Sequence, residues 1–132
     1  MIRTFALSAI LVVSLAACSS KTDTSSTTSP GQTAGDFTVA TQFSPDPPKQ
    51  GPETITVAVK DASGSPVNGA TVKISSTMPA MSMTGPTLSA TDNGDGTYSA
   101  QTNLNYATQW KFDIAVSASG KSGIAHVTED IK

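Results

Sequence analysis

The stretch TQWKFDIAVS, residues 108–117, decides the fold class of this 132-residue chain. Its apolar side chains recur at every second position: Trp110, Phe112, Ile114 and Val116. Because successive side chains of a β-strand point to opposite faces, this alternation predicts a strand with one face on a core. Trp110 is the only tryptophan in the chain, so we expect the core to gather around it.

Outward from this stretch, six further segments are rich in Val, Ile and Thr, and clusters of Gly, Pro, Asn and Asp separate them. The seven predicted strands are 37–43, 54–60, 70–75, 87–91, 97–103, 108–117 and 123–128. No segment has a helical pattern that would make parallel crossovers, so we predict an all-β, immunoglobulin-like antiparallel β-sandwich of about seven strands in one domain, residues 36–132. In the last strand two inward faces stay open, Ile124 with His126 or Ala125 with Val127.

The beginning of the chain has the pattern of a secretory signal. Arg3 gives a positive n-region, and residues 5–13 form an apolar run that is too short to span a bilayer. The sequence Leu15-Ala16-Ala17-Cys18 resembles the bacterial lipobox, in which the preceding peptide is removed and the cysteine is acylated. We expect residues 1–17 to be a lipoprotein signal peptide and Cys18 to carry fatty-acyl chains such as palmitate, which would hold the protein on a membrane. The alternative is an ordinary signal peptide with a cysteine near its end.

Residues 18–35 contain the expected lipidated cysteine and a Ser/Thr-rich linker that lacks large apolar side chains. Such a composition predicts a disordered tether. By resemblance to enterobacterial sorting, the lack of Asp after Cys18 favours the outer membrane. We therefore expect a lipid-anchored protein of the cell envelope, either on the outer membrane facing the periplasm or at the cell surface.

The charge balance excludes several classes of partner. Removal of Arg3 leaves seven Lys against ten Asp and Glu, a mature net charge of about −3. A negative net charge does not attract nucleic acid or anionic lipid. We therefore expect no nucleic-acid partner, and we expect the protein to contact the membrane through its own lipid anchor. Acylation would also consume the only thiol, and with one histidine and no evident carboxylate pair we predict no enzymatic activity.

The turn Asp92-Asn93-Gly94-Asp95-Gly96 concentrates oxygen ligands, but it does not match a calcium loop. If Gly96 is aligned with the invariant glycine of an EF-hand, Thr91 and Thr102 stand where the first Asp and the last Glu belong. Asn-Gly and Asp-Gly instead supply positive φ angles for a tight hairpin, so we predict a structural turn.

Three of the four methionines fall within six residues, in Met78-Pro79-Ala80-Met81-Ser82-Met83. Thioethers are soft ligands that suit Cu(I), so Met78, Met81 and Met83 form a candidate metal site, with His126 as a possible fourth ligand. A second interpretation remains open, in which the methionines fill gaps over Trp110 and His126 is an ordinary strand residue.

Several of these segments together are similar to the YtkA-like domain family, which is related to the FixH proteins. The matching features are the Pro-Pro segment, residues 61–70 as D-x-x-G-x-P-V-x-G-A, the Met78-Pro79-Ala80-Met81 loop, Gly96-Thr97-Tyr98 and the Trp110 strand. The resemblance covers nearly all of residues 36–127. It implies an immunoglobulin-like envelope domain, found near copper-handling and oxidase-assembly systems and beside membrane-fusion proteins of efflux pumps, without established catalysis. Related copper-associated loops often carry a histidine close to the methionines, whereas this chain has Ser82, Met83 and Thr84 there.

Two functions therefore stay open at the level of sequence. The first is a lipid-anchored envelope module that binds or delivers Cu(I) through the methionine loop. The second is a scaffold or adhesion module, without metal, that binds an envelope protein such as an efflux or oxidase assembly component.

Overall fold

The computed structural model describes residues 29–132, which form nine β-strands and one short 3₁₀ turn. The expected signal peptide and Cys18 lie outside the described residues. The elements are β1 (Ser29–Ala34), β2 (Phe37–Ser44), β3 (Gly51–Lys60), β4 (Thr71–Met78), η1 (Pro79–Met81), β5 (Met83–Ser89), β6 (Thr91–Asp92), β7 (Thr97–Leu104), β8 (Gln109–Ala118) and β9 (Lys121–Asp130).

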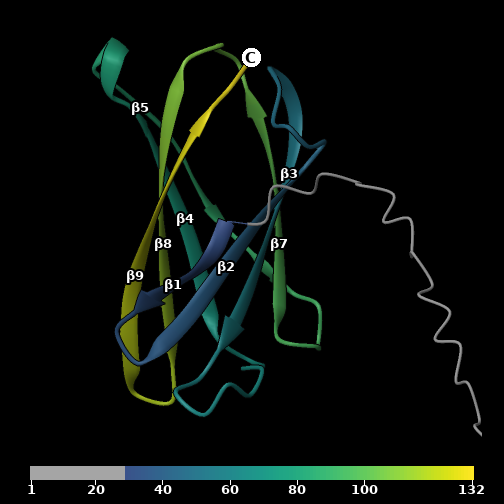
Figure 1. The fold of residues 1–132 in the computed structure, drawn as a ribbon, viewed down its shortest axis with the longest axis vertical. Coiled ribbons are helices and arrows are strands. Elements are labelled where there is room, and N and C mark those ends of the chain that lie inside the picture. Colours follow the sequence, from purple (N-terminus) through teal and green to yellow (C-terminus); the bar gives the residue numbers. More distant parts are fainter. Residues whose placement is uncertain (1–28) are drawn as a thin grey trace, which may run out of the picture.

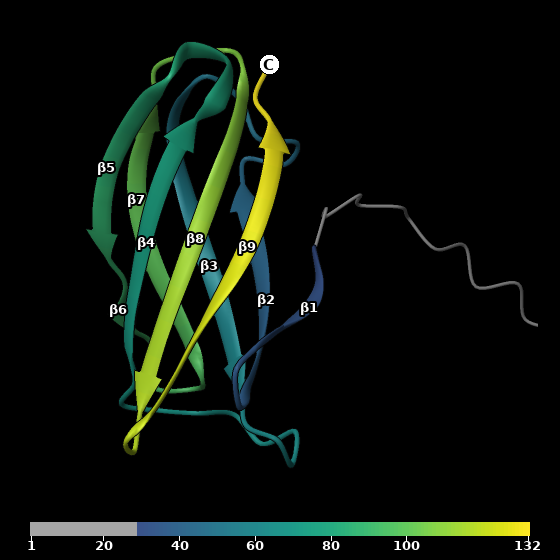
Figure 2. The same cartoon turned by 90° about the vertical axis from the view of Figure 1, so that its left-hand side faces the viewer.

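Two antiparallel sheets pack face to face, as Figures 1 and 2 show. One sheet has the order β1-β2-β3-β7-β6 and the other has the order β5-β4-β8-β9. The seven predicted strands correspond to β2, β3, β4, β5 with β6, β7, β8 and β9. The prediction of an all-β, immunoglobulin-like sandwich is therefore confirmed. Within residues 29–132, no helix has the length and apolar character needed to cross a membrane.

The core forms where the alternating faces of the two sheets meet. All four alternating apolar residues of β8 are buried, and Trp110 is only 2% exposed. The Phe112 ring lies between two other rings, with its centroid 6.1 Å from that of Trp110 and 5.4 Å from that of Phe43. In β9 the fold selects one of the two open faces, because Ala125 and Val127 are buried while Ile124 is exposed. Burial of each large apolar side chain contributes about 1.5 to 3 kcal/mol, which explains why Trp110 and its neighbours organise the domain.

The expected tether needs a correction, because residues 29–34 are not a linker but strand β1. This strand pairs with β2 and also lies beside β9, where Gly123 approaches the carbonyl oxygen of Ala34 so closely that no Cβ would fit. Ala34 is fully buried. Main-chain pairing with β2, the buried Ala34 side chain and the Gln32 side chain, which accepts the His126 N–H at 3.2 Å, hold the segment in place. None of these contacts needs a large apolar residue, so the composition gave no sign of the strand. The ordered domain thus begins before Asp36.

The up-and-down course of the strands gathers the loops at two opposite ends of the sandwich (Figure 1). We call one the clasp end, made of the loops 61–70, 93–96 and 119–120. We call the other the methionine end, made of the loops 45–50, 79–82 and 105–108 and of residues 131–132. The three clustered methionines lie at the methionine end, and the family motifs at residues 61–70 and 96–98 lie at the clasp end.

Candidate functional site

The three clustered methionines lie on one turn at the methionine end, but they differ in exposure. Met78 ends β4 with its side chain in the core, 2% exposed, whereas Met81 and Met83 are 42% and 40% exposed. Met78 and Met83 are directly paired across the β4–β5 ladder. Between them, Pro79 begins η1 and Ser82 closes it in the left-handed region with φ 51°, donating its N–H to the Pro79 carbonyl at 3.2 Å. The turn therefore presents two thioethers to solvent and keeps the third inside.

The sequence left two interpretations of the methionines open, a soft-metal site and gap filling in the core, and the structure divides the residues between them. Met78 takes the core position that gap filling predicts. Met81 and Met83 do not, because a side chain that fills the core would not leave two fifths of its surface in water. Exposed thioethers are the ones that a soft ion or a protein partner can reach.

The methionine turn rests against the tryptophan. A Cβ at Gly85, two residues after Met83, would lie 3.1 Å from the Trp110 ring and would also clash with the Ser76 hydroxyl. On its other side, Trp110 donates its Nε1–H to the Tyr106 carbonyl at 3.0 Å. Tyr106 is itself 39% exposed, so this end carries three exposed large apolar side chains: Met81, Met83 and Tyr106.

His126 does not join the methionines. It projects from the outer face of β9, where its Nδ1 lies 2.6 Å from Asp113 Oδ1 on β8. Met78 faces the opposite side of the same sheet, and β4 and β8 separate β9 from the strand of Met83. The candidate set of Met78, Met81, Met83 and His126 is therefore not gathered at one place, and we correct the expectation of His126 as fourth ligand. Nor do residues 29–132 hold a group of three or more His, Cys, Asp or Glu side chains that would bind a metal ion.

At the clasp end, Asp61 of the family motif at residues 61–70 accepts hydrogen bonds from within the same motif. Asp61 Oδ1 accepts hydrogen bonds from the main-chain N–H groups of Ser63 and Ser65 at 2.9 and 3.0 Å. These bonds, together with the bond from the Ser63 hydroxyl, lower the pKa of Asp61 below 3.8 because they stabilise the carboxylate form. The motif thus shapes a turn and presents no free acid.

Tyr98 ties this loop to the sheet. Its ring is fully buried, its hydroxyl donates to the Val67 carbonyl at 2.6 Å, and the same oxygen accepts the Ala70 N–H at 3.0 Å. This resembles the tyrosine corner of immunoglobulin-like domains, in which a buried hydroxyl holds a main-chain loop. Gly96, two residues earlier, has φ 83° and lies so close to Pro66 that no Cβ would fit. Two motifs that are far apart in the chain are therefore one structural clasp.

The hairpin 92–96 is a structural turn, as predicted. Asp92 accepts the N–H groups of Gly94 and Gly69 at 2.8 and 2.6 Å, one on each carboxylate oxygen. Asp95 accepts the Thr97 N–H at 3.0 Å and the Thr97 hydroxyl, and these bonds lower its pKa below 3.8. Both oxygens of Asp92 and one oxygen of Asp95 thus accept hydrogen bonds that shape the turn.

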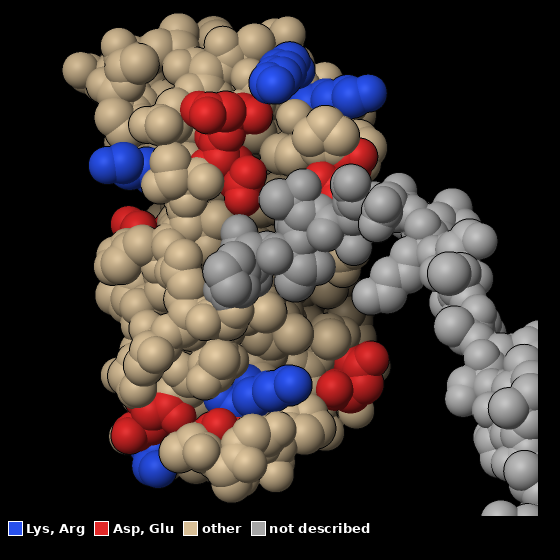
Figure 3. Space-filling model, in the orientation of Figure 1, with Lys and Arg blue, Asp and Glu red and all other residues tan. Residues whose placement is uncertain are grey.

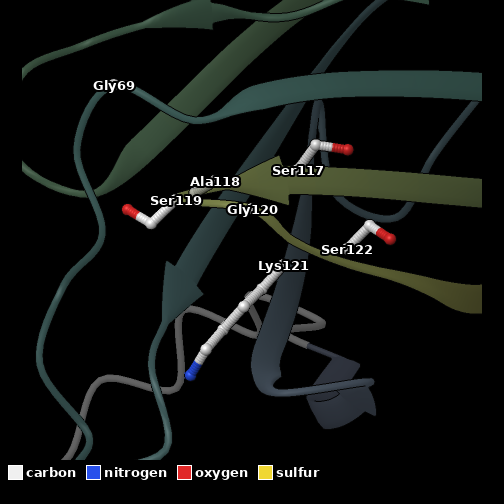
Figure 4. A pocket seen from close by; sticks show the side chains of 7 residues that line it. All are labelled: Gly69, Ser117, Ala118, Ser119, Gly120, Lys121 and Ser122. Carbon is white, nitrogen blue, oxygen red and sulfur yellow. The ribbon is translucent and has the colours of Figure 1, made fainter.

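A shallow hollow of about 420 Å³ lies beside the clasp end, against the β8–β9 hairpin (Figure 4). Its lining is main chain and small side chains, Gly69 and residues 117–122, and Lys121 is the one charged residue among them. Figure 4 shows the hydroxyls of Ser117 and Ser119 pointing in different directions. A single ammonium group without an acidic or imidazole neighbour in this lining does not make an acid–base pair.

One buried acidic residue, Glu53, was not among the residues that the sequence pattern singled out. Glu53 belongs to β3, faces the interior and is 2% exposed. Burial raises its pKa above 4.5, and repulsion from Asp46 adds to this, while the nearby N–H groups of Lys49 and Ser44 act in the opposite direction. The alternation of the strand could have indicated its position, because Glu53 lies two residues before Ile55 and therefore on the same inward face as Ile55 and Val57. The predicted strand, however, began one residue later.

One comparison with known proteins found a family. A family model described as YtkA-like matches residues 31–115, from β1 into β8, which is more than half of the chain. No curated protein and no solved structure gave a match. The match includes the clasp, the hairpin and the methionine turn, and it points to an envelope-associated module. The chain therefore belongs to the YtkA-like family.

Proposed function

We propose that this protein is a lipid-anchored binding module of the cell envelope that binds or delivers Cu(I) through Met81 and Met83. Family membership supports an envelope-associated role. The lipobox-like Leu15-Ala16-Ala17-Cys18 supports the anchor, which would tie the module to the outer membrane facing the periplasm or to the cell surface. We propose no catalysis, because acylation of Cys18 would leave the chain without a free thiol, and its only histidine is not among the residues that line the hollow at the clasp end.

The observation that supports Cu(I) is the exposure of two thioethers on one ordered turn. Thioether sulfur is uncharged and polarisable, so it matches Cu(I) and competes poorly with water for Zn(II) or Ca(II). Met78 fixes the base of the turn in the core and stands opposite Met83, so it would become a third donor only by leaving its buried position. We therefore expect modest affinity and easy release, which suits delivery more than storage.

A competition titration against a Cu(I) chromophore, under anaerobic conditions and with the full chain in detergent, tests this function. The double variant Met81→Leu, Met83→Leu keeps the apolar volume and removes both sulfurs, so it should lose binding. His126→Gln is the matched control and should bind like the wild type. Binding should not change with pH near neutrality, since thioethers do not titrate. If the double variant competes as well as the wild type, the Cu(I) proposal is wrong.

A second candidate function, docking of an envelope protein partner such as an efflux or oxidase assembly component, is favoured by the position of Tyr106. Met and Tyr are enriched at protein interfaces, and Tyr106, Met81 and Met83 are exposed at the same end. The leucine variants separate the two functions, because they preserve an apolar docking surface and abolish thioether ligation. Docking would survive Met81→Leu, Met83→Leu and be lost in Met81→Ser, Tyr106→Ser, as measured by co-purification from envelope fractions.

The anchor has its own test. Cys18 is the only cysteine, so Cys18→Ser should move the protein from the membrane fraction to the soluble fraction. Labelling with an alkyne fatty acid should mark the wild type alone. A variant that stays on the membrane after a carbonate wash would contradict the lipoprotein assignment.

A further inference from the structure

Glu53 is placed where an ionised carboxylate is costly. Its side chain lies in the interior at the methionine end and is 2% exposed. The N–H groups of Lys49 and Ser44 are near, but neither carboxylate oxygen accepts a hydrogen bond at an ordinary distance and angle. Thr102, its partner across the β3–β7 ladder, is uncharged. A buried carboxylate without strong partners is far less stable than the neutral acid.

The loop 45–50 covers this carboxyl group and closes the end of the sandwich. Pro48 of the loop is buried. Gln50 fastens the loop at two points, since its N–H donates to the Lys132 carbonyl at 2.9 Å and its side-chain amide donates to the Asn105 carbonyl at 2.5 Å. Ile131, itself buried, donates its N–H to the Thr108 carbonyl at 3.0 Å. The loop and the last residues of the chain therefore form one lid over Glu53.

The charges around Glu53 do not neutralise it. The elements packed here bring Asp46 and Lys49 from the loop, Glu129 from β9 and Lys132 from the last residues. Of these, Asp46 acts on the Glu53 carboxyl by repulsion, and the side chains of Lys49 and Lys132 are exposed. The carboxyl groups here do not make a metal site, because the described residues hold no group of three or more His, Cys, Asp or Glu side chains placed to bind a metal ion. A proton binds to a single carboxylate without other ligands. We therefore take a proton to be the cation that Glu53 binds.

We propose that Glu53 is a proton-operated latch of the methionine end. When the carboxyl group is protonated, it lies in the interior as a neutral group and the lid stays closed. When it releases its proton to solvent, the buried carboxylate repels Asp46 and draws water, and the loop 45–50 loosens.

The sign of the effect follows from the raised pKa of Glu53. Its contribution to stability is fully present below the unfolded value of 4.5 and is lost as the pH rises through the folded value. Rising pH should therefore weaken the lid, opposite to the usual behaviour of a carboxylate that is stabilised by hydrogen bonds.

Thermal unfolding of the full chain in detergent, measured between about pH 4 and 8, tests the latch, with Glu53→Gln as a permanently neutral isostere. The wild type should match Glu53→Gln at the acidic limit and fall below it as the pH rises, with a midpoint above 4.5. Hydrogen exchange of the Gln50 and Ile131 amides should accelerate over the same interval in the wild type, relative to Glu53→Gln. Asp130→Asn, at an exposed carboxylate of the same end, is the control and should follow the wild type.

Asp46→Asn keeps the test valid if Glu53→Gln does not fold. It leaves Glu53 in place and removes the repulsion, so it should move the wild-type midpoint to lower pH. A pH-independent difference between wild type and Glu53→Gln would overturn the latch. So would lower stability of Glu53→Gln than of the wild type at pH 8, because the fold would then require the carboxylate.

Discussion

The clasp end and the methionine end of the sandwich are held together in different ways. At the clasp end, Asp61, Asp92 and Asp95 accept main-chain N–H groups, and Tyr98 holds the loop from inside. At the methionine end, Trp110 and Met78 pack in the core, and hydrogen bonds from Gln50 and Ile131 join the loops to one another. The carboxyl group of Glu53 is buried there, and burial outweighs the nearby N–H groups of Lys49 and Ser44, so its pKa is raised. The family motif at residues 61–70 therefore stabilises the fold, whereas the exposed methionines and the buried Glu53 lie at the opposite end.

Charge does not distinguish the two ends. On the face in Figure 3, acidic and basic side chains occur together toward both ends. What differs is one carboxyl group: Asp61 and Asp95 of the clasp end are exposed and hydrogen-bonded, whereas Glu53 at the methionine end is buried. The two ends should therefore respond to pH with opposite sign.

The largest expected effect comes from removal of the tryptophan beneath the methionine turn. Trp110→Ala should reduce the free energy of unfolding by about 3 to 5 kcal/mol, because it leaves a cavity next to Phe112 and under Gly85. Urea unfolding followed by circular dichroism measures this loss without the tryptophan signal. A loss below about 1 kcal/mol would show that the methionine end does not depend on this ring.

An intermediate effect is expected at the clasp end from Tyr98→Phe. The ring stays buried, but the Val67 carbonyl and the Ala70 N–H lose their shared partner, at a cost of about 1 to 3 kcal/mol. Tyr106→Phe is the matched control, because the Tyr106 side chain is exposed. This variant should change the free energy of unfolding of the protein by less than about 0.5 kcal/mol. If the two variants are equally stable, the clasp is not held by the hydroxyl.

The smallest effect is expected from the exposed acids of the clasp. The pKa values of Asp61 and Asp95 are lowered by hydrogen bonds from Ser63 and Thr97, so the stability they provide is present above the unfolded value of 3.8 and is lost as the pH falls through the folded values. The double variant Asp61→Asn, Asp95→Asn should lose less stability than the wild type as the pH falls below 3.8. It should keep the loss of stability at higher pH that we assign to Glu53. Acid titration of the melting temperature checks this. An unchanged acid limb would assign it to other carboxylates.

Local pattern predicted most of the fold. The alternation in residues 108–117 and 54–60 and the Gly-rich turns placed seven strands, because side-chain parity and positive φ angles are properties of short segments. It did not choose the inward face of β9, where both faces carry an apolar residue and only packing against the other sheet excludes Ile124. It also did not find β1, because this strand lacks large apolar side chains and is placed by pairing with β2.

The sequence by itself determined the sandwich, the hairpin at 92–96, the central position of Trp110 and the family resemblance, because each depends on residues close in the chain or on a motif. Only the tertiary structure decided which methionines are exposed, that His126 lies away from them, and that Glu53 is enclosed beneath the loop 45–50. These are relations between residues from different strands and loops. The path of the chain in space sets them, since a side chain's access to water depends on what the rest of the fold places over it.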